Sequence, residues 1–503
     1  MSEHLGCYGE KVAKTPILDQ LASEGIRYTN FYATAGVCAP SRSAIITGMH
    51  QQTIGTQHMR TLAVSAGSAS DPFPPNFKTY SAVIPENVKC FPEYLRESGY
   101  YCSNNSKEDY QFVAPPTVWD ESNKNAHWRN RPDKNQPFFS VFNLMVTHES
   151  QVYERAKEPL LVNPEDVIVP PYYPDVPEVR KDIAIFLSNV MEMDKQVGKI
   201  LAELKEDGLL ENTIIFFFSD HGDGLPFAKR EVYDRGLRVP FIIKFPANKY
   251  TNSIDSQLHS FVDLAPTILS LANIPIRKNM QGQAFLGNQK AQSQRKYIYA
   301  ARDRMGSVYD RVRAVRDGRY KYIRNYMPEK PLYQNIPYRL QLPMMPAILK
   351  LKDDGKLNET QMKWFVPTKP KEELYDCQND YFEFNNLADK PEFQEKLKEL
   401  RKVHEDFTKN YGDMGEQNEM EMVSKWWGGN QGPPKTEVVK AENVDGKCKL
   451  ITSTTSASVG YKNNVKSTWK VYTKPFSIQR GDSLYTIAQR IGYKKSEIGK
   501  MVW

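Results

Sequence analysis

The chain has 503 residues, of which 40% are hydrophobic and 25% are charged, and its formal net charge is +7. This length and composition predict a globular protein of two to four domains and exclude an intrinsically disordered chain. The charges are scattered and form no basic block, so they favour anionic ligands only mildly and do not indicate a nucleic-acid partner.

Targeting signals and cysteine patterns narrow the class further. No apolar run approaches the roughly 18 residues that a membrane helix requires, so no membrane span is expected. The first residues, MSEHLGCYGE, lack the charged start and apolar stretch of a secretory signal. The six cysteines form no CxxC pair and no regular spacing, which argues against a disulfide scaffold or a zinc cage.

The first part of the chain alternates helices with apolar strands. Residues 15–46 are predicted to form a helix, a short strand, a loop and a second helix, with Pro40 and Ser41 in the first turn of that second helix. Residues 138–146 form an apolar run without alternation, which is typical of a strand covered on both faces.

The same alternation continues after this strand. Residues 183–204 carry apolar side chains at helical spacing, and Gly208 is expected to end this helix. Two further apolar strands are predicted at residues 214–218 and 239–244. Helices that alternate with buried strands predict an α/β fold built on a largely parallel sheet.

The pattern changes after about residue 286. A hairpin that turns at Asp317-Gly318 is predicted within residues 313–324. A charged amphipathic helix is predicted within residues 389–410, with Asp389 and Glu392 as a capping box. These elements predict a second, smaller α+β subdomain.

A turn-rich linker at residues 426–437 precedes short strands rich in Thr, Ser, Val and Tyr, which predict a small β module. The segment RGDSLYTIAQRIGY, residues 480–493, also suggests a LysM peptidoglycan-binding motif, but too few residues follow it to complete that motif. The predicted domains are residues 1–288, 289–425 and 437–503.

The stretch GVCAPSRSAIITG places Cys38 and Arg42 at the predicted start of a helix. A buried small hydrophobe is the common role of a free cysteine, whereas a helix N-terminus and a nearby arginine would favour a reactive thiolate. The cysteine-phosphatase loop requires an arginine at position 44, which is Ala44 here. The chain has no Walker loop, and Phe227 breaks the dinucleotide-binding pattern that begins at Gly222.

The remaining pattern, Cys-x-Pro-Ser-Arg followed by a helix and Thr-Gly, resembles the signature of the sulfatase family. Other blocks are similar to that family as well: LGCYG, TPILDQLASEGIRYTNFYA, FFFSDHG, YDRGLRVPFII and ELYDCQNDYFEFNNLADKP. The resemblance covers residue 1 to about 410, above all to bacterial sulfatases related to heparan N-sulfatase. It implies an alkaline phosphatase-like α/β/α sandwich with a smaller α+β C-terminal subdomain, and the last module looks like a β-sandwich appended to some of these enzymes.

The resemblance implies hydrolysis of sulfate esters or sulfamates of a carbohydrate. It also implies that a partner, a formylglycine-generating or anaerobic sulfatase-maturating enzyme, oxidises Cys38 to formylglycine. A hydrated aldehyde beside a divalent cation is easily deprotonated, so one of its oxygens attacks sulfur and the other then collapses back to the aldehyde. A thiol or a simple hydroxyl cannot perform this last step.

The resemblance also assigns roles to the other polar residues. Asp220 and His221 follow a buried strand and would bind the metal together with residue 38; calcium is the usual ion, although it prefers oxygen ligands to imidazole. Arg42 would hold the hydrated aldehyde. Taken alone, Asp220 and His221 would ordinarily form a turn and a cap, and Arg42 would ordinarily form a structural salt bridge. Further candidates are Lys107, His148 and Lys229 for sulfate binding and protonation, and His58 and Arg60 for the substrate cleft.

Two features of the chain depart from the family pattern. Many sulfatases carry a histidine where Asp109 stands, and their LGCYG block follows a strand that ends in two acidic metal ligands. We therefore expect an N-terminal truncation or a misassigned start codon, weak metal binding by the chain as written, and a periplasmic or secreted full-length protein. Two alternatives stay open: a phosphoester or phosphonate hydrolase of the same superfold, and a catalytically inactive protein that binds sulfated glycans.

Overall fold

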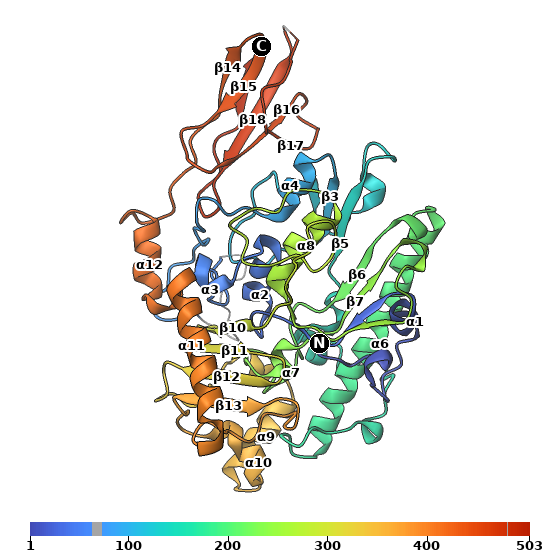
Figure 1. Ribbon diagram of the computed structural model, residues 1–503, viewed down its shortest axis with the longest axis vertical. Coiled ribbons are helices and arrows are strands. Elements are labelled where there is room, and N and C mark those ends of the chain that lie inside the picture. The colour runs from blue at the N-terminus through green and yellow to red at the C-terminus, as the bar shows by residue number, and fades with distance from the viewer. Residues whose placement is uncertain (63–72, 480) are drawn as a thin grey trace.

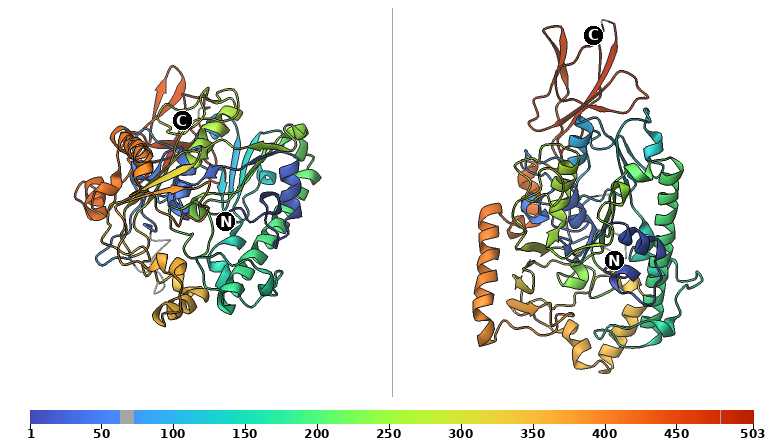
Figure 2. Two further views of the ribbon diagram at one scale, coloured as in Figure 1. Left: turned by 60° about the horizontal axis from the view of Figure 1, so that its bottom comes forward. Right: turned by 45° about the vertical axis from the view of Figure 1, so that its right-hand side comes forward.

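A computed structural model of the chain describes residues 1–62, 73–479 and 481–503 (Figure 1). Strands lie between helices in the body of the molecule, with α6 (Pro177–Glu206) and α11 (Gln394–Tyr411) on opposite sides (Figure 1). The last segment of the chain forms a separate β module that projects from one end (Figure 2). The predicted α/β class is therefore confirmed.

Three small sheets form the centre of the first part. β3 runs parallel to β4 and β5, and β1 runs parallel to β8, but β7 is antiparallel to both of its neighbours. The chain returns from β6 to β7 through a loop and the short helix α7, without a long crossover helix, so the two strands run in opposite directions. The prediction of a largely parallel sheet is wrong at this point. The strands and their order are β6 (Ile215–Phe218), β7 (Phe241–Lys244), β1 (Ile26–Tyr28) and β8 (Ser253–Asp255); β4 (Glu121–Ser122), β3 (Tyr101–Asn105) and β5 (Phe138–Phe142); and β2 (Phe31–Tyr32) with β9 (His259–Ser260).

Helices cover both faces of these strands, which explains why the strands are apolar throughout. In β7, Ile242 packs in a core with α1 and α6, whereas Phe241 and Ile243 pack in a second core with α2, α4 and α8. Successive side chains of a strand point to opposite faces, so the alternation identifies an α/β/α sandwich. The helices are α1 (Pro16–Ser23), α2 (Cys38–Thr47), α3 (Gln51–Ile54), α4 (Phe91–Glu97), α5 (Ser150–Glu154), α6 (Pro177–Glu206), α7 (Asp234–Leu237) and α8 (Leu264–Leu271).

In the described part of the chain, the strands β5 and β6 each stand at the edge of a sheet and have a partner strand on one side only. Within the described residues, β5 pairs with β3 alone and β6 with β7 alone, and every residue of both strands is only half-buried.

The second part is built on an antiparallel sheet. The hairpin predicted at Asp317-Gly318 is confirmed, since β11 and β12 pair on either side of it. The capping box at Asp389 and Glu392 is wrong: Pro391–Phe393 forms a 3-10 turn, so α11 begins only at Gln394, too far along the chain for Asp389 to cap it. The elements are β10 (Ile298–Arg302), β11 (Val312–Arg316), β12 (Tyr320–Asn325), α9 (Met344–Asp353), α10 (Glu359–Met362), β13 (Glu372–Asp376), α11 (Gln394–Tyr411) and α12 (Glu419–Trp426).

Two small sheets pack on each other in the C-terminal module. Cys448 and Leu450 from one sheet and Val459, Leu484 and Ala488 from the other share its core. Half of the segment with LysM character is the strand β18, and its described residues form no helix, which a LysM motif requires at this position. Arg480 lies outside the described residues. The strands are β14 (Lys440–Val444) with β15 (Lys447–Ile451), and β17 (Lys470–Val471), β16 (Ser458–Lys462), β18 (Ser483–Gln489) and β19 (Gly499–Val502).

No helix among the described residues is long and apolar enough to cross a membrane.

A buried ion pair fastens α12 to the rest of the second part. Arg304 donates to both carboxylate oxygens of Glu419 at 2.6 and 2.8 Å, and both side chains are fully buried. Arg304 also donates to the carbonyls of Met59 and Gly306. The pair therefore joins segments that are distant in sequence.

Replacing Glu419 by alanine should lower the free energy of unfolding by about 3–5 kcal/mol, because the Arg304 guanidinium stays buried without its carboxylate. The matched control is Glu421→Ala, which removes an exposed carboxylate from the same helix and should cost no more than about 0.5 kcal/mol. Urea denaturation followed by tryptophan fluorescence measures both. Equal losses for the two variants would refute the structural role of the pair.

Candidate active site

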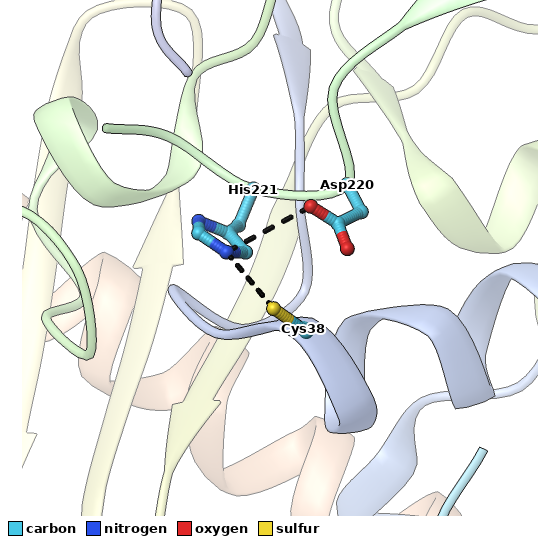
Figure 3. Close-up of side chains that lie close together, drawn as sticks. All are labelled: Cys38, Asp220 and His221. Atoms are coloured by element: carbon cyan, nitrogen blue, oxygen red, sulfur yellow. Dashed lines mark hydrogen bonds and ion pairs between the residues drawn. The ribbon is translucent and has the colours of Figure 1, made fainter. Parts of the chain in front are cut away.

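Cys38 is the first residue of α2, and the loop after β6 brings Asp220 and His221 to it (Figure 3). Val37 precedes the helix in an extended conformation. The Ser41 hydroxyl donates to the Asp220 carbonyl at 2.6 Å, which ties the first turn of α2 to the loop. The free N–H groups at the start of α2 thus point toward the space beside the carboxyl end of β6.

Three donor atoms converge at this point. The Cys38 Sγ lies 3.3 Å from His221 Nε2, which lies 3.7 Å from Asp220 Oδ1, and all three donor atoms lie within 4.8 Å of one another. His221 Nδ1 lies 3.0 Å from the Gly222 carbonyl, to which it can only donate. Its Nε2 therefore turns a lone pair toward Cys38 and Asp220. A carboxylate, an imidazole lone pair and the side chain of residue 38 fit a divalent cation.

Two lysines and two histidines surround the thiol. Burial alone raises the pKa of Cys38, but Lys107, Lys229 and His221, together with a hydrogen bond from His148, hold this pKa well below its ordinary value. Lys107 pairs with Asp109 at 3.4 Å, and Lys229 is almost fully buried. The site is therefore built to stabilise negative charge at residue 38.

His148 is held in one tautomer. The backbone N–H of Ser150 donates to His148 Nδ1 at 3.2 Å, so the ring carries its proton on Nε2 and can donate it toward Cys38. Burial lowers the pKa of His148, and Lys229 lowers it further. A neutral ring with an N–H donor at this position can hydrogen-bond to negative charge at residue 38.

Arg42 is fixed by four contacts. Its guanidinium lies 3.6 Å from Asp220 and donates to the carbonyls of Glu108 and Lys107 and to the side chain of Asn143. Burial and Cys38 raise the pKa of Asp220, but His221, Lys107 and Arg42 outweigh them and lower it. Arg42 thus helps to keep Asp220 ionised next to residue 38.

Two residues that the sequence interpretation missed complete the site. Glu149 is fully buried, lies 3.2 Å from Lys229 and accepts two hydrogen bonds of 2.8 Å from Arg230. Burial raises the pKa of this carboxyl, but Arg230 and Lys229 outweigh burial and lower it. Asn143 accepts from Arg42 and donates to Asn104. A polar residue that ends an apolar strand is the sequence signal that points to Asn143; Glu149 beside the candidate His148 had a weaker one.

The two predicted cleft residues lie in different surroundings. Arg60 lies over the ring of Tyr338, which Arg230 also approaches, so it connects to the Glu149 pair. His58 is buried against Arg304 and Tyr309, and burial lowers its pKa to about 4. Arg60 therefore reaches the site only through Tyr338 and Arg230, and His58 lies beside Arg304 and Tyr309. The structure brings together the other candidates, which are Cys38, Arg42, Lys107, His148, Asp220, His221 and Lys229. The roles of all nine residues stay predictions.

Comparison with known proteins identifies the family. Residues 1–274 match the family model described as Sulfatase, and residues 222–335 match the one described as N-sulphoglucosamine sulphohydrolase, C-terminal. An "Ulvan-active sulfatase" of Formosa agariphila is 44% identical to this chain, over 99% of this chain and 89% of its own length. The chain belongs to the sulfatase family. It is a sulfuric ester hydrolase, and the predicted resemblance is confirmed.

Further relatives of this sulfatase agree with the fold. Human "N-sulphoglucosamine sulphohydrolase" is 24% identical over 79% of this chain and 85% of its own length. A protein solved in complex with its substrate D-glucosamine-2-N,6-O-disulfate is 20% identical, covers 82% of this chain and 96% of its own, and superposes with a TM-score of 0.55. The alkaline phosphatase-like architecture is thus confirmed. Sulfatases use a formylglycine and a divalent metal. The cluster at residue 38 contains a cysteine from which a formylglycine can form and donor atoms that can bind a metal.

Replacing Glu149 by glutamine should destabilise this sulfatase by about 3–5 kcal/mol, because Lys229 and Arg230 then stay buried without a carboxylate. Thermal unfolding at several protein concentrations measures the loss. Glu154→Gln, five residues along the chain on the exposed end of α5, is the matched control and should leave the transition unchanged. An unchanged transition for both variants would show that the two cations do not depend on Glu149.

Proposed function

We propose that this sulfatase acts on a sulfated polysaccharide of the ulvan type, through a formylglycine at residue 38 and a bound calcium ion. The convergence of Cys38, Asp220 and His221 among buried cations carries the proposal. The 44% identity to an "Ulvan-active sulfatase" supports the substrate class. A formylglycine-generating or anaerobic sulfatase-maturating enzyme would install the aldehyde, and a polymeric substrate outside the cell implies a periplasmic or secreted enzyme.

The bound cation would stabilise negative charge on the oxygens of residue 38 and of the sulfate group. Asp220 and His221 would hold it, and conversion of the Cys38 thiol to oxygen groups would add the hard donors that calcium prefers. Three donors alone do not fill the six to eight positions of calcium, so water or substrate oxygens would occupy the rest.

The residues of the chain itself divide the remaining work. Lys107 and Lys229 approach residue 38 as ammonium groups and would bind sulfate oxygens, in a buried site where such contacts are strong. His148, in its doubly protonated form with Nδ1 facing Ser150 Oγ, would give the Nε2 proton to the leaving oxygen or nitrogen and return to the neutral ring. Arg42 is oriented by hydrogen bonds to Asn143 and two carbonyls, lies 3.6 Å from Asp220, and would hold the hydrated aldehyde.

Sulfate release from ulvan oligosaccharides, followed by ion chromatography, tests the substrate class. We expect turnover by protein matured in a competent host, and a loss of about 10³-fold or more for Cys38→Ala, since removal of a nucleophile disables the whole site. Cys102→Ala, at a buried cysteine on β3, is the matched control and should keep its activity. Faster release of phosphate from an aryl phosphate than of sulfate from an aryl sulfate would favour the phosphoester alternative.

Removal of the metal tests the second half of the proposal. Treatment with a chelator should abolish sulfate release, and calcium should restore it better than magnesium, manganese or zinc, because calcium accepts irregular oxygen coordination. Restoration by zinc in preference to calcium would contradict the calcium assignment. Retention of full activity after exhaustive chelation would contradict a metal role altogether.

A further inference from the structure

The excess positive charge of the chain is concentrated in the C-terminal module. Residues 437–503 contain 12 Lys and Arg residues but 5 Asp and Glu residues, a net charge of +7 that equals the net charge of the whole chain. Acidic and basic residues balance in the remaining 436 positions. The charges scattered along the sequence thus hide a segregation, and the module alone presents a positive field to anionic polymers.

A row of side chains on the larger sheet of the module focuses this charge. The register places Lys462 on β16 opposite Tyr485 on β18, and Tyr485 opposite Lys500 on β19. Residues directly opposite on adjacent strands lie on the same face, so the three form one Lys462–Tyr485–Lys500 row. The Lys500 ammonium lies 5.8 Å from the centre of the Tyr485 ring, and that of Lys462 lies 4.6 Å from the ring of Trp469.

This row lies on the face that does not form the core of the module. Leu484 and Ala488, on the opposite face of β18, are fully buried against the other sheet. Tyr485 and Trp469 are only partly buried, and Lys500 is exposed. Two aromatic rings and the Lys500 ammonium therefore face solvent beside the half-buried Lys462, whose ammonium donates to the Val465 carbonyl at 2.5 Å.

The catalytic part covers one end of the same face and fixes the orientation of the module. A Cβ added to Gly460 would lie 3.2 Å from Thr117, so β16 meets the body directly there. The fully buried Glu93 of α4 accepts hydrogen bonds from Ser458 and Thr117, and Arg96 of the same helix donates to the Trp469 carbonyl. One part of this sheet face is thus covered by the catalytic part, and the row lies on the part that stays uncovered. The module itself projects from one end of the molecule (Figure 2).

We propose that the Lys462–Tyr485–Lys500 row, with Trp469, binds a chain of sulfated polysaccharide. Ammonium groups would pair with sulfate groups, and aromatic rings would pack against the apolar faces of sugar rings. The proposal rests on the proposed function, because it assigns to the sulfatase a polymeric substrate that is held at a second place. A module fixed to the catalytic part would raise the local concentration of sulfate groups near residue 38.

Affinity electrophoresis of the full chain in gels containing dextran sulfate tests this proposal, with unsulfated dextran as the reference. The double variant Lys462→Gln/Lys500→Gln should weaken binding about tenfold or more and lower the salt dependence by one to two in log–log slope. Lys447→Gln/Lys449→Gln is the matched control: it removes the same charge from the outer face of β15, where the intervening Cys448 points into the core. This control should change binding by about twofold at most.

Several outcomes would overturn the proposal. Equal weakening by the two double variants would show that the module acts through its overall charge and not through the row. Binding of duplex DNA as tight as that of dextran sulfate, and equally sensitive to the row variant, would identify a general polyanion site. Unchanged binding by Tyr485→Ala and Trp469→Ala would refute the contact with sugar rings.

The test separates this proposal from the proposed function. Turnover of a small aryl sulfate should be the same for the row variant and the parent protein, because the row lies outside the catalytic machinery. A chain that binds dextran sulfate through the row but releases sulfate from no probe would refute the catalytic proposal and support the binding site. Loss of aryl sulfate turnover together with polymer binding in the row variant would contradict the proposed separation of the two sites.

Discussion

The site depends on the burial of several cations around one residue. Removing Lys107, Lys229 and Arg42 from water is costly, and the structure offsets this cost with carboxylates at Glu149 and Asp220 and with negative charge at residue 38. An anion that enters such a site finds donors that are already oriented. The same arrangement that costs folding stability would therefore favour a bound anion such as the proposed sulfate group.

The fold supplies this arrangement through the ends of its elements. α2 begins at Cys38 with its free N–H groups directed at the site, and the loop after β6 supplies Asp220 and His221. Lys107 and His148 follow β3 and β5, two parallel neighbours, so their side chains come from the same edge of the sheet. Ligand binding at the carboxyl ends of strands is the general behaviour of open α/β sheets, and the position of the candidate site agrees with it.

The sequence predicted the features that depend on local pattern. The helix start at Cys38, the strand before Asp220 and the long amphipathic helix α6 were predictable, because capping residues and apolar periodicity specify them. The direction of β7 was not, since it depends on how a loop of irregular structure folds back. Glu149 and Asn143 were missed because their roles arise from contacts with Arg230, Lys229 and Arg42, which lie far away in sequence.

The location of the net positive charge also became clear only from the structure. The total of +7 suggests a mild preference for anions when it is spread over 503 residues, but it becomes a strong local field once the module is known to be a separate body. The pairing of Lys462, Tyr485 and Lys500 follows only from the strand register, which no pattern in the sequence specifies. The candidate active site and the basic module together would suit the proposed polyanionic substrate.

The most direct test of this account is the chemical state of residue 38 in active protein. Mass spectrometry of the peptide that contains Cys38, from protein produced with a maturating enzyme, should show an aldehyde in place of the thiol. The fraction converted should rise in proportion to the rate of sulfate release across preparations. Full activity in protein whose Cys38 keeps its sulfur would contradict the account.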